Sequence, residues 1–544
     1  MQGNMMDTPL QIIDLLDHGR RHHPDQEVVS RRVEGDIHRC SYQELWQRSA
    51  QLAHALEQLG VQSGDCVATL AWNTYRHMEL YYAVSGSGAV LHTVNPRLFG
   101  EQIEYIINHA EDRFVFFDLS FVELLEPLLK RLETVKGFVV MTDREHMPET
   151  SLSPLYCYEE LMADQPVSFD WPRLDENTAA SLCYTSGTTG NPKGVLYSHR
   201  SVVLHAQAAA SRELLDLDTQ TVLLPMVTMY HVGAWGAPYA APLSGCRLVL
   251  PGPGMDGRSM AELIESEGVT VGLGVPTIWL TLHEYWQEHG ISESTLERVC
   301  VGGAASPLGM VRRYQEQYGI YWQPIWGMTE TGPLVTSLPP TPELLRLPAE
   351  ERYRLQTTAG RAAFGTQMAI FDEQDRPLPH DGETSGELRV RGPWVCSQYF
   401  RKEDRSDFPG GWLATGDIAV IDARGHLRVV DRKKDVIKSG GEWISSLEIE
   451  NIASQHPAVS ECTVIGVRHE KWDERPVLLV VQNRGEHIDE DGLRAFLDGR
   501  MARWWMPNRI LFVDSLPKTG TGKVRKNELR EQYDDLLLTA TAGE

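Results

Sequence analysis

A stretch rich in hydroxyl groups and glycines, "YTSGTTGNPKGVLYSH", occupies residues 184–199. Hydroxyls and backbone amides donate hydrogen bonds to phosphate oxygens, glycine lets the backbone approach a ligand, and lysine supplies positive charge. The residues that we expect to bind phosphate here are Thr185, Ser186, Gly187, Thr188, Thr189, Gly190 and Lys193. The spacing is not that of a Walker A sequence, because Lys193 lies three residues beyond Gly190. The stretch therefore predicts a phosphate clamp of another kind and excludes a P-loop NTPase.

The segments on either side of this loop favour β-strands. The apolar run "ASLCY" leads into the loop and "GVLYSH" leaves it, so the loop is expected to join two strands instead of opening a helix. Upstream, Ser41 and Glu44 form a capping box before a helical leucine stripe that ends at Gly60. "DCVATLAW" then reads as a buried strand, and "IEYIINHAEDRFVFFD" as a helix followed by a strand. This alternation predicts an α/β fold whose large N-terminal domain has layered, mostly parallel sheets with flanking helices.

A second domain is expected after the charge cluster Asp431–Asp435. Beyond it, short helix and strand patterns such as "IENIASQH", "CTVIGV" and "RPVLLVV" suffice for a small α+β domain. A charged, solvated strip between two packable blocks is typical of a hinge. We therefore predict an N-terminal domain over 1–431 and a mobile C-terminal domain over 432–544.

Composition excludes several classes of protein. The net charge of −24 argues against a nucleic-acid backbone or an anionic membrane as the main partner. No apolar run is long enough for a membrane span, and the N-terminus lacks a signal-peptide pattern, so no integral membrane contact is expected. The eight cysteines are scattered singly, which favours a reducing, cytoplasmic location over a disulfide framework.

Several motifs together resemble those of the adenylate-forming superfamily of acyl-CoA synthetases, luciferases and peptide-synthetase adenylation domains. Besides "YTSGTTGNPKGV", they are "GGAAS" at 302–306, "WGMTE" at 326–330, "TGD" at 415–417, "DRKKDVIKSGGEWIS" from 431 and "KTGTGK" at 518–523. The resemblance covers essentially the full length. Within the superfamily, "HVGAWG", "KSGGEWISS" and "HEKWDERP" resemble bacterial medium- and long-chain fatty acid–CoA ligases and the related 3-methylmercaptopropionate–CoA ligases.

The resemblance implies that ATP and a carboxylic acid first form an acyl-adenylate, which CoA then converts to a thioester. Glu330 would be a ligand of Mg²⁺, a hard ion that prefers oxygen, with Thr185 behind it, and Thr329 would donate to the α-phosphate. Asp417 would accept the ribose hydroxyls, and Arg432 would reach the ribose from the other domain. The remaining residues that the resemblance places at the nucleotide and the acyl head are Gly302, Ala304, Trp326, Gly327 and Met328.

The C-terminal motifs imply a lysine that serves only the first half-reaction. Lys523 would bridge the carboxylate and the α-phosphate during adenylation, and Lys438 would assist in that arrangement. Rotation about Lys434 would then withdraw Lys523 and present a segment for CoA. The residues expected to line the path of CoA are Ser439, Gly440, Gly441, Glu442 and Trp443.

The stretch "LLPMVTMYHVGAWG" is expected to form the acyl pocket. By resemblance, His231 separates the carboxylate end from ATP, and Trp235 gates the entry of the chain. Thr228, Tyr230 and Gly233 depart from the Pro, Phe and Asn of related fatty acid ligases, which leaves the preferred acid open.

Two functions other than a fatty acid–CoA ligase stay open at this point. One is a ligase for 3-methylmercaptopropionate or another short or branched acid; the other, less favoured, is an adenylation module that loads a separate carrier protein. A non-catalytic nucleotide-binding protein is disfavoured, because Lys193, Glu330, Asp417, Arg432 and Lys523 are all present. The resemblance also leaves a homodimer open.

Overall fold

The computed structural model describes residues 1–544 except 2, 186–190, 441, 484, 519–523 and 539–544, with only the backbone described for 442 and 443. Contacts divide the chain into two compact units. The first comprises Met1–Gln367 and Arg391–Leu413; the second comprises Met368–Val390 and Ala414–Glu544. The boundary expected at residue 431 falls inside the second unit, because the strands between 367 and 432 pair in one sheet. Where the chain hinges stays a prediction.

The first unit contains a seven-stranded sheet with the order β7–β6–β5–β3–β4–β8–β9. Neighbouring strands are parallel except β8 and β9, which are antiparallel. The strands, in chain order, are β3 (Cys66–Leu70), β4 (Val90–Thr93), β5 (Phe114–Phe117), β6 (Gly137–Val140), β7 (Leu155–Cys157), β8 (Ala179–Tyr184) and β9 (Gly194–Ser198).

A nine-stranded sheet of the same unit has the order β16–β15–β14–β13–β12–β10–β11–β1–β2. The strands from β14 to β1 are parallel, and the edge strands are antiparallel. The strands are β1 (Glu27–Arg31), β2 (Ile37–Ser41), β10 (Val222–Pro225), β11 (Arg247–Leu250), β12 (Val271–Gly274), β13 (Arg298–Val301), β14 (Tyr321–Gly327), β15 (Leu334–Ser337) and β16 (Arg361–Ala362).

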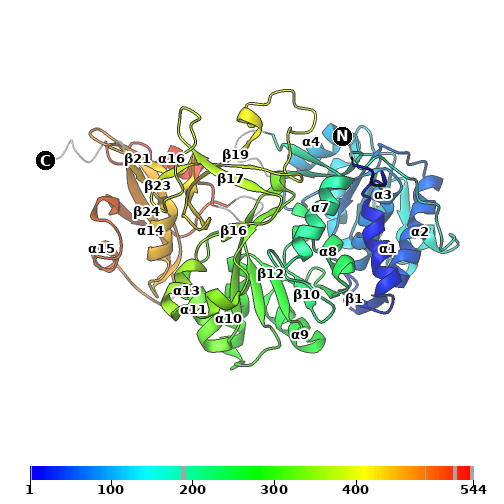
Figure 1. The fold of residues 1–544 in the computed structure, drawn as a ribbon, viewed down its shortest axis with the longest axis horizontal. Helices are drawn as coiled ribbons and strands as arrows, with labels where there is room; N and C mark the ends of the chain where they lie inside the picture. The colour runs from blue at the N-terminus through cyan, green and yellow to red at the C-terminus, as the bar shows by residue number, and fades with distance from the viewer. Residues whose placement is uncertain (2, 186–190, 441, 484, 519–523, 539–544) are drawn as a thin grey trace. The chain divides into compact units, whose positions relative to one another are not determined.

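Helices cover both faces of each sheet. One core joins inner residues of both sheets to α1 (Ile12–His22), α2 (Tyr42–Gln58), α3 (Tyr75–Gly86), α7 (His199–Ala210) and α8 (Ala237–Ser244), of which α1, α7 and α8 lie side by side in Figure 1. A second core packs α9 (Gly257–Glu267), α10 (Pro276–Glu288) and α11 (Leu308–Tyr318) on the other face of the nine-stranded sheet. A third packs α4 (Gly100–Ala110) on the other face of the seven-stranded sheet. The shorter helices are α5 (Val122–Leu125), α6 (Tyr158–Met162), α12 (Pro342–Leu345) and α13 (Ala349–Leu355).

The layered α/β fold predicted from the sequence is confirmed. Parallel strands buried on both faces require apolar residues at successive positions, and Val67 and Ala68 on β3 enter different cores. The Ser41–Glu44 capping box starts α2, and the phosphate-loop stretch joins β8 to β9.

The second unit contains two sheets. The four-stranded sheet has the order β17–β18–β19–β20, with β17 (Gln367–Phe371), β18 (Ser385–Arg391), β19 (Leu413–Ile421) and β20 (Leu427–Arg432). The five-stranded sheet contains β21 (Ile437–Ser439), β22 (Glu442–Ile444), β23 (Val459–His469), β24 (Asp473–Gln482) and β25 (Arg509–Phe512). The helices of this unit are α14 (Ser446–Ala453), α15 (Glu490–Leu497) and α16 (Lys526–Tyr533).

The expectation of a solvated strip at 431–435 is wrong at its two aspartates. Asp431 is buried, and its carboxylate accepts a hydrogen bond from the Ser446 amide at 2.6 Å. Asp435 is also buried and pairs with Arg530 of α16 at 2.9 Å. Asp431 thus binds the start of α14, and Asp435 binds α16, which lies far along the chain.

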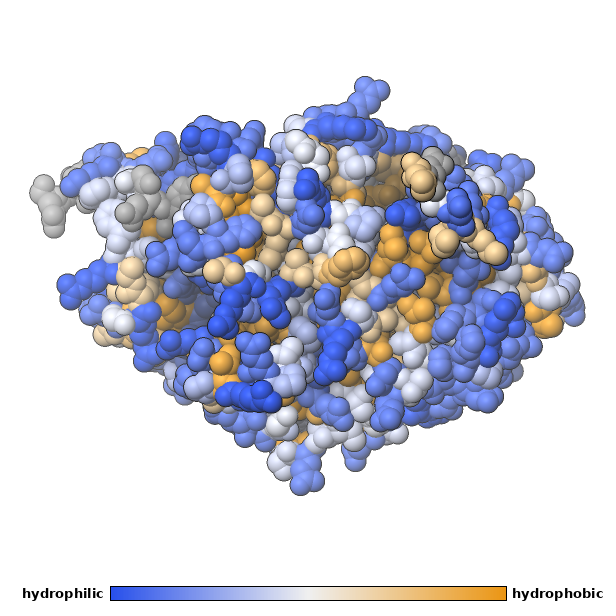
Figure 2. Space-filling view, viewed as in Figure 1, coloured by the Kyte–Doolittle hydropathy of each residue, from blue (hydrophilic) through white to orange (hydrophobic). Residues whose placement is uncertain are grey.

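One face of the surface is mostly hydrophilic (Figure 2). Hydrophilic residues cover most of the face seen in Figure 2, with smaller apolar areas between them. Among the described residues, none of the helices combines the length and apolar character needed to cross a bilayer.

Candidate active site

The predicted site residues of the first unit follow the carboxyl ends of neighbouring strands. His231 to Trp235 come after β10, Gly302 and Ala304 after β13, and Trp326 to Glu330 close or follow β14. The strands β10, β12, β13 and β14 are parallel neighbours, so these segments emerge at one edge of the sheet. Ligands of open α/β sheets bind at this edge.

The phosphate loop is closed at its base by the β8–β9 pair. The Thr185 amide donates to the Lys193 carbonyl oxygen at 2.9 Å, and the Lys193 amide donates to Thr185 Oγ1 at 3.4 Å. The predicted phosphate-binding residues Ser186, Gly187, Thr188, Thr189 and Gly190 lie outside the described residues.

Tyr399 brings the lysine of this loop close to the predicted metal ligand. The Tyr399 hydroxyl donates to Glu330 Oε1 at 2.8 Å, and the Lys193 ammonium lies 4.5 Å from the centre of the Tyr399 ring. Glu330 is buried, whereas Lys193 is half-exposed and pairs with Asp407 at 2.9 Å. Burial, followed by the charge of Glu330, raises the pKa of Tyr399, so the phenol keeps its proton and acts as a donor.

Sequence reasoning missed Tyr399, Asp407 and Tyr197. The Tyr197 hydroxyl donates to the Thr329 carbonyl oxygen at 2.6 Å and so anchors the 3₁₀ turn Thr329–Thr331. Met328 supports the same turn, because its amide donates to Thr331 Oγ1 at 2.9 Å. In the sequence, Tyr399 is marked only by its place in the run "SQYF" next to a charged segment. No local pattern indicates that its hydroxyl contacts Glu330.

The predicted acyl residues form an unusual turn. All five residues from Val232 to Gly236 have positive φ, between 46° and 83°. Only glycine adopts this region without steric cost, so a left-handed run that includes Val232, Ala234 and Trp235 stores strain. Trp235 packs partly buried beside Gly302, where a Cβ atom would lie 3.2 Å from the Trp235 ring.

A narrow cavity lies behind this turn. Its wall includes Val232, Gly233 and Gly236 of the turn, together with Gly332 and Pro333, which follow the Thr329–Thr331 turn. Gly233 lines this cavity, and its acyl-binding role stays a prediction. The separating role of His231 and the gating role of Trp235 stay predictions.

In the second unit, Asp417 and Arg432 face each other across paired strands. They are register partners on β19 and β20, and Arg432 Nε lies 2.9 Å from Asp417 Oδ1. Asp417 is buried, and Arg432 also donates to the Thr415 carbonyl oxygen at 3.3 Å. The two residues therefore belong to one unit of the structure, which differs from the expectation that Arg432 reaches the ribose from another domain.

The residues predicted for CoA and for the switch lie around the β21–β22 hairpin. Lys438 on β21 is exposed, Ser439 is buried and accepts from Arg475 at 3.1 Å, and Gly440 lies in the turn. Glu442 and Trp443 belong to β22 by their backbone, and Lys434 is exposed between β20 and β21. Gly441 and Lys523 lie outside the described residues.

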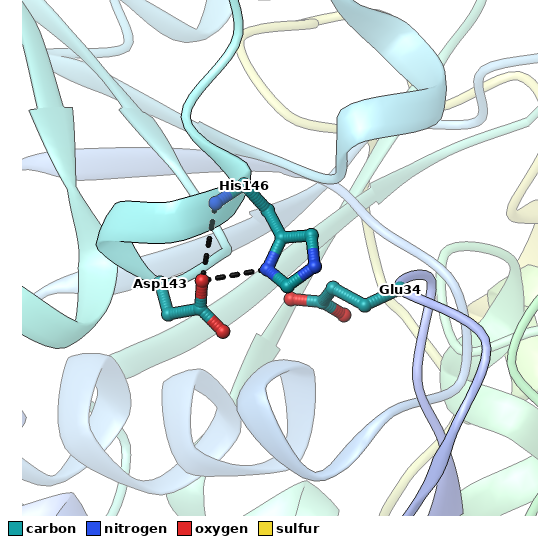
Figure 3. Close-up of side chains that lie close together, drawn as sticks. All are labelled: Glu34, Asp143 and His146. Carbon is teal, nitrogen blue, oxygen red and sulfur yellow. Dashed lines mark hydrogen bonds and ion pairs between the residues drawn. The ribbon is translucent and has the colours of Figure 1, made fainter.

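Glu34, Asp143 and His146 form a separate group of potential metal ligands (Figure 3). Their charges are already balanced: Glu34 accepts from Arg76 at 2.7 Å, and Asp143 bonds the His146 ring at 2.6 Å. Arg32 also lies 3.8 Å from Asp143. Because two guanidinium groups repel a divalent cation, we interpret this group as an ion-paired turn and not as a metal centre.

Comparisons with known proteins place these features in one family. The model described as "AMP-binding enzyme" matches residues 16–400, and "AMP-binding enzyme C-terminal domain" matches 448–523. The chain is 47% identical over 537 residues to the 3-methylmercaptopropionyl-CoA ligase of Ruegeria lacuscaerulensis, covering 99% of this chain and 100% of that protein. It is 44% identical over 543 residues to the medium-chain-fatty-acid–CoA ligase of Ectopseudomonas oleovorans, covering 100% of each.

The fold is also that of a solved ligase. The structure of the anthranilate CoA ligase AuaEII with anthranoyl-AMP superposes with a TM-score of 0.86 at 23% identity and covers 99% of this chain and 100% of that chain. The family models and the full-length relatives together show that this chain belongs to the AMP-binding enzyme family.

Proposed function

We propose that the protein is an ATP-dependent, AMP-forming acid–CoA ligase. The observation that carries this is the grouping of Lys193 and the Glu330 carboxylate on Tyr399, at the base of a hydroxyl-rich loop. Such a pair holds a cation for phosphate oxygens and an anion for a metal in one place. The full-length similarity to two named CoA ligases supports the same function.

The reaction has two steps. The acid is first joined to AMP, and its acyl group is then transferred from the AMP oxygen to the sulfur of CoA. In the first, a carboxylate oxygen forms a bond to the α-phosphorus of ATP, and the bond from that phosphorus to the pyrophosphate oxygen breaks. In the second, the CoA thiolate forms a bond to the acyl carbon, and the bond to the AMP oxygen breaks. Both steps gather several negative charges, so the main task of the protein is to neutralise and orient them.

The roles of this chain's residues in the first step follow from their charge. Lys193 leaves its ion pair with Asp407 and binds a phosphate oxygen. Thr329 donates a hydrogen bond to the α-phosphate, and the buried carboxylate of Asp417 accepts hydrogen bonds from the ribose hydroxyls. Lys523, in the proposed function, bridges the acid and the α-phosphate. Lys434 is the hinge that separates the two half-reactions, after which Ser439 to Trp443 border the path of CoA.

Glu330 fits a magnesium ion, with Thr185 in support. Its carboxylate is a hard ligand, and the Tyr399 hydroxyl fixes one of its oxygens. Bound there, Mg²⁺ would supply positive charge against the phosphate oxygens of ATP. A cytoplasmic location belongs to the same proposal, supported by eight free cysteines in the described chain.

The acid is the open part of the proposal. Medium- and long-chain fatty acids were expected from the sequence. However, the relative named as a medium-chain-fatty-acid–CoA ligase and the relative named as a 3-methylmercaptopropionyl-CoA ligase share similar sequence identity with this chain. Sequence similarity alone therefore does not choose between them.

The test is AMP release from ATP and CoA with acids from propionate to palmitate, 3-methylmercaptopropionate included. We expect AMP and pyrophosphate only when acid, ATP and CoA are all present. A holo-carrier protein replaces CoA in a parallel assay to identify a carrier-loading module. Formation of ADP, or turnover without acid, would contradict the proposal.

Two lysines provide matched variants for this test. Lys193 and Lys402 both pair with Asp407, at 2.9 Å and 3.4 Å, but only Lys193 belongs to the phosphate loop. Lys193→Ala should reduce acid-dependent pyrophosphate exchange by about 10² to 10³. Lys402→Ala should change it by less than about threefold, as expected for a half-exposed ion pair outside the phosphate loop. If both variants lost pyrophosphate exchange equally, the effect would come from the lost ion pair with Asp407 and not from lost phosphate binding.

A further inference from the structure

The left-handed turn Val232–Gly236 has a strained backbone. Val232, Ala234 and Trp235 have φ values of 52°, 46° and 58°, a region that residues with a side chain rarely adopt. Within this segment, the Thr228 carbonyl oxygen accepts the Ala234 amide at 3.2 Å. A strained backbone persists only where its surroundings hold it, so contacts from outside the turn must stabilise it.

Asn73 holds the backbone that enters this turn. It directly precedes Thr74, the N-cap of α3, and it is fully buried. Its side-chain amide group donates to the carbonyl oxygens of Pro225 and Val227 at 2.9 Å and 2.8 Å, and its side-chain oxygen accepts the Met229 amide at 2.7 Å. Both donors of this side chain are therefore used on one short stretch of backbone, together with its oxygen.

Two tyrosines of α3 hold the backbone on the two sides of the turn. Tyr81 donates to the Met229 carbonyl oxygen at 2.6 Å, before the turn, and Tyr82 donates to the Pro238 carbonyl oxygen at 2.7 Å, after it. In a regular helix the amide of residue 242 would donate to that second carbonyl, but Pro242 of α8 has no amide hydrogen. Tyr82 thus supplies a hydrogen bond that α8 cannot make by itself.

The turn forms part of the wall of the narrow cavity behind it. Val232, Gly233 and Gly236 line this cavity, and so do two residues that directly follow the Thr329–Thr331 turn of the proposed site. A relaxation of the left-handed backbone would therefore change the shape of the cavity. Tyr82 is not part of the cavity wall, so it affects the cavity only through the backbone that it holds.

We propose that Asn73, with Tyr81 and Tyr82 of α3, positions the acyl site: these side chains hold the left-handed turn in the conformation that shapes the cavity for the carboxylic acid. The inference rests on the proposed ligase function and on the acyl-binding role predicted for the turn. It assigns acid binding to side chains that act through the backbone of the turn.

The experiment removes the support at each end of the turn. Asn73→Ala removes the three hydrogen bonds before it, and Tyr82→Phe removes the one after it. KM for the acid and KM for ATP are measured by AMP release, with the best acid of the series from propionate to palmitate. KM for the acid should rise about tenfold or more in Asn73→Ala and about 3- to 10-fold in Tyr82→Phe.

The same variants should bind ATP nearly as the wild type does. Lys193, Glu330 and Tyr399 lie on other segments of the chain, so neither variant removes a hydrogen bond from them. KM for ATP should therefore change by less than about threefold, which separates an effect on the acid from a general loss of activity.

Selectivity among acids gives a second readout. A turn that is held in one conformation favours the acids that fit the cavity, whereas a released turn admits others. The ratio of kcat/KM between the best and the poorest acid that the wild type activates should therefore shrink in both variants. A loss of stability alone would lower kcat/KM for all acids alike and leave this ratio unchanged.

Gln356 provides a matched control. Its side chain is fully buried, donates to the Trp322 carbonyl oxygen at 2.7 Å and accepts from Gln315 at 2.8 Å. Neither this residue nor its two partners line the cavity. Gln356→Ala should lower the melting temperature, as Asn73→Ala does, and leave both KM values and the ratio between acids unchanged.

The outcomes separate this inference from the proposed function. An unchanged KM for the acid, an equal rise of both KM values, or the same changes in Gln356→Ala overturns the inference and leaves the ligase function standing. If Asn73→Ala does not fold, Tyr82→Phe decides alone, because it removes a single hydroxyl. Absence of acid-dependent AMP release by the wild type with every acid overturns the proposed function, and this inference with it.

Discussion

The charged residues of the proposed site are paired within the protein. Lys193 pairs with Asp407, Glu330 accepts from Tyr399, and Asp417 pairs with Arg432. A buried or half-buried charge without a partner is costly, so these partners offset the cost of burying the charges before any ligand is present. In the proposed function, ATP must displace some of these partners from the charged residues. The strength of each pair then affects how readily its charged residue binds ATP.

Tyr399→Phe tests whether this tyrosine positions Glu330. Loss of one hydrogen bond to a charged group should raise the Mg²⁺ concentration needed for half-maximal adenylation by about tenfold. Calorimetric titration of ATP and Mg²⁺ should show the same weakening in the absence of acid. Tyr321→Phe is the control, because its hydroxyl donates to the Leu338 carbonyl oxygen at 3.0 Å, outside the proposed site. The same weakening in both variants would reduce Tyr399 to a structural role.

His205 gives the protein a pH-dependent stability. Burial lowers its pKa to about 3, and its Nε2 accepts the Leu334 amide at 3.0 Å, which requires the neutral ring. The unfolded chain titrates near pH 6.5 and binds more protons below that pH, so stability is full above 6.5 and falls as pH decreases toward 3. Between pH 7 and pH 5 we expect a loss of about 2 kcal/mol from this residue.

His205→Gln isolates that contribution, because a glutamine oxygen can accept the same amide. Urea unfolding of both proteins at pH 7 and pH 5 measures it, and other buried histidines cancel in the comparison. An unchanged difference between the two pH values in the variant would show that His205 is not responsible.

Among the secondary-structure elements, the strand ends and the turn after β10 determine the shape of the predicted acyl site. Parallel strands deliver their carboxyl ends to one edge, and the left-handed Val232–Gly236 turn folds back against α7 and α8. Gly236 makes this possible, because a Cβ there would lie 2.8 Å from the His205 ring.

Gly236→Ala should therefore be costly in two ways. Its φ of +83° disfavours alanine by about 1–2 kcal/mol, and the contact with His205 should add about 1–3 kcal/mol of overpacking. Gly268→Ala is the matched control, since Gly268 has a φ of +64° and open space around it. Chemical denaturation should show a larger loss for Gly236→Ala, and KM for the acid should rise only in that variant. Equal losses would mean that the His205 contact relaxes freely.

At the scale of the whole molecule, the chain separates into two units, and the proposed chemistry needs both. Lys193 and Glu330 belong to the first, whereas Asp417, Lys434 and Lys438 belong to the second. The segment around Lys434 is tied to its own unit by Asp431 and Asp435, which contact α14 and α16. The residues on both sides of Lys434 are therefore anchored, and a rotation at Lys434 would have to strain or break one of these contacts.

Two variants should separate the half-reactions. Lys523→Ala should reduce pyrophosphate exchange by about 10² to 10³ and leave thioester formation from added acyl-adenylate largely intact. Lys434→Pro should leave pyrophosphate exchange largely intact and reduce thioester formation, because proline fixes φ and restricts rotation at the proposed hinge. Stopped assays of each half-reaction measure both effects. Equal loss of both half-reactions in Lys523→Ala, or normal turnover in Lys434→Pro, would contradict the switch.

Features that arise within short segments could be predicted from the amino-acid sequence. Periodicity gave the alternating helices and strands, the Ser41–Glu44 box gave the start of α2, and the loop motif gave the β8–β9 connection. These signals depend on neighbours a few residues apart, so they can be read without a fold.

The pairings between distant residues and the shape of the proposed site arise only when the chain folds. Tyr399 meets Glu330, Asp407 meets Lys193, and Asp435 meets Arg530, each from a distant part of the chain. The left-handed turn after β10 likewise depends on what packs around it. Such contacts leave no local pattern, because the energy that selects them comes from burial and charge neutralisation between segments that the chain brings together only when it folds.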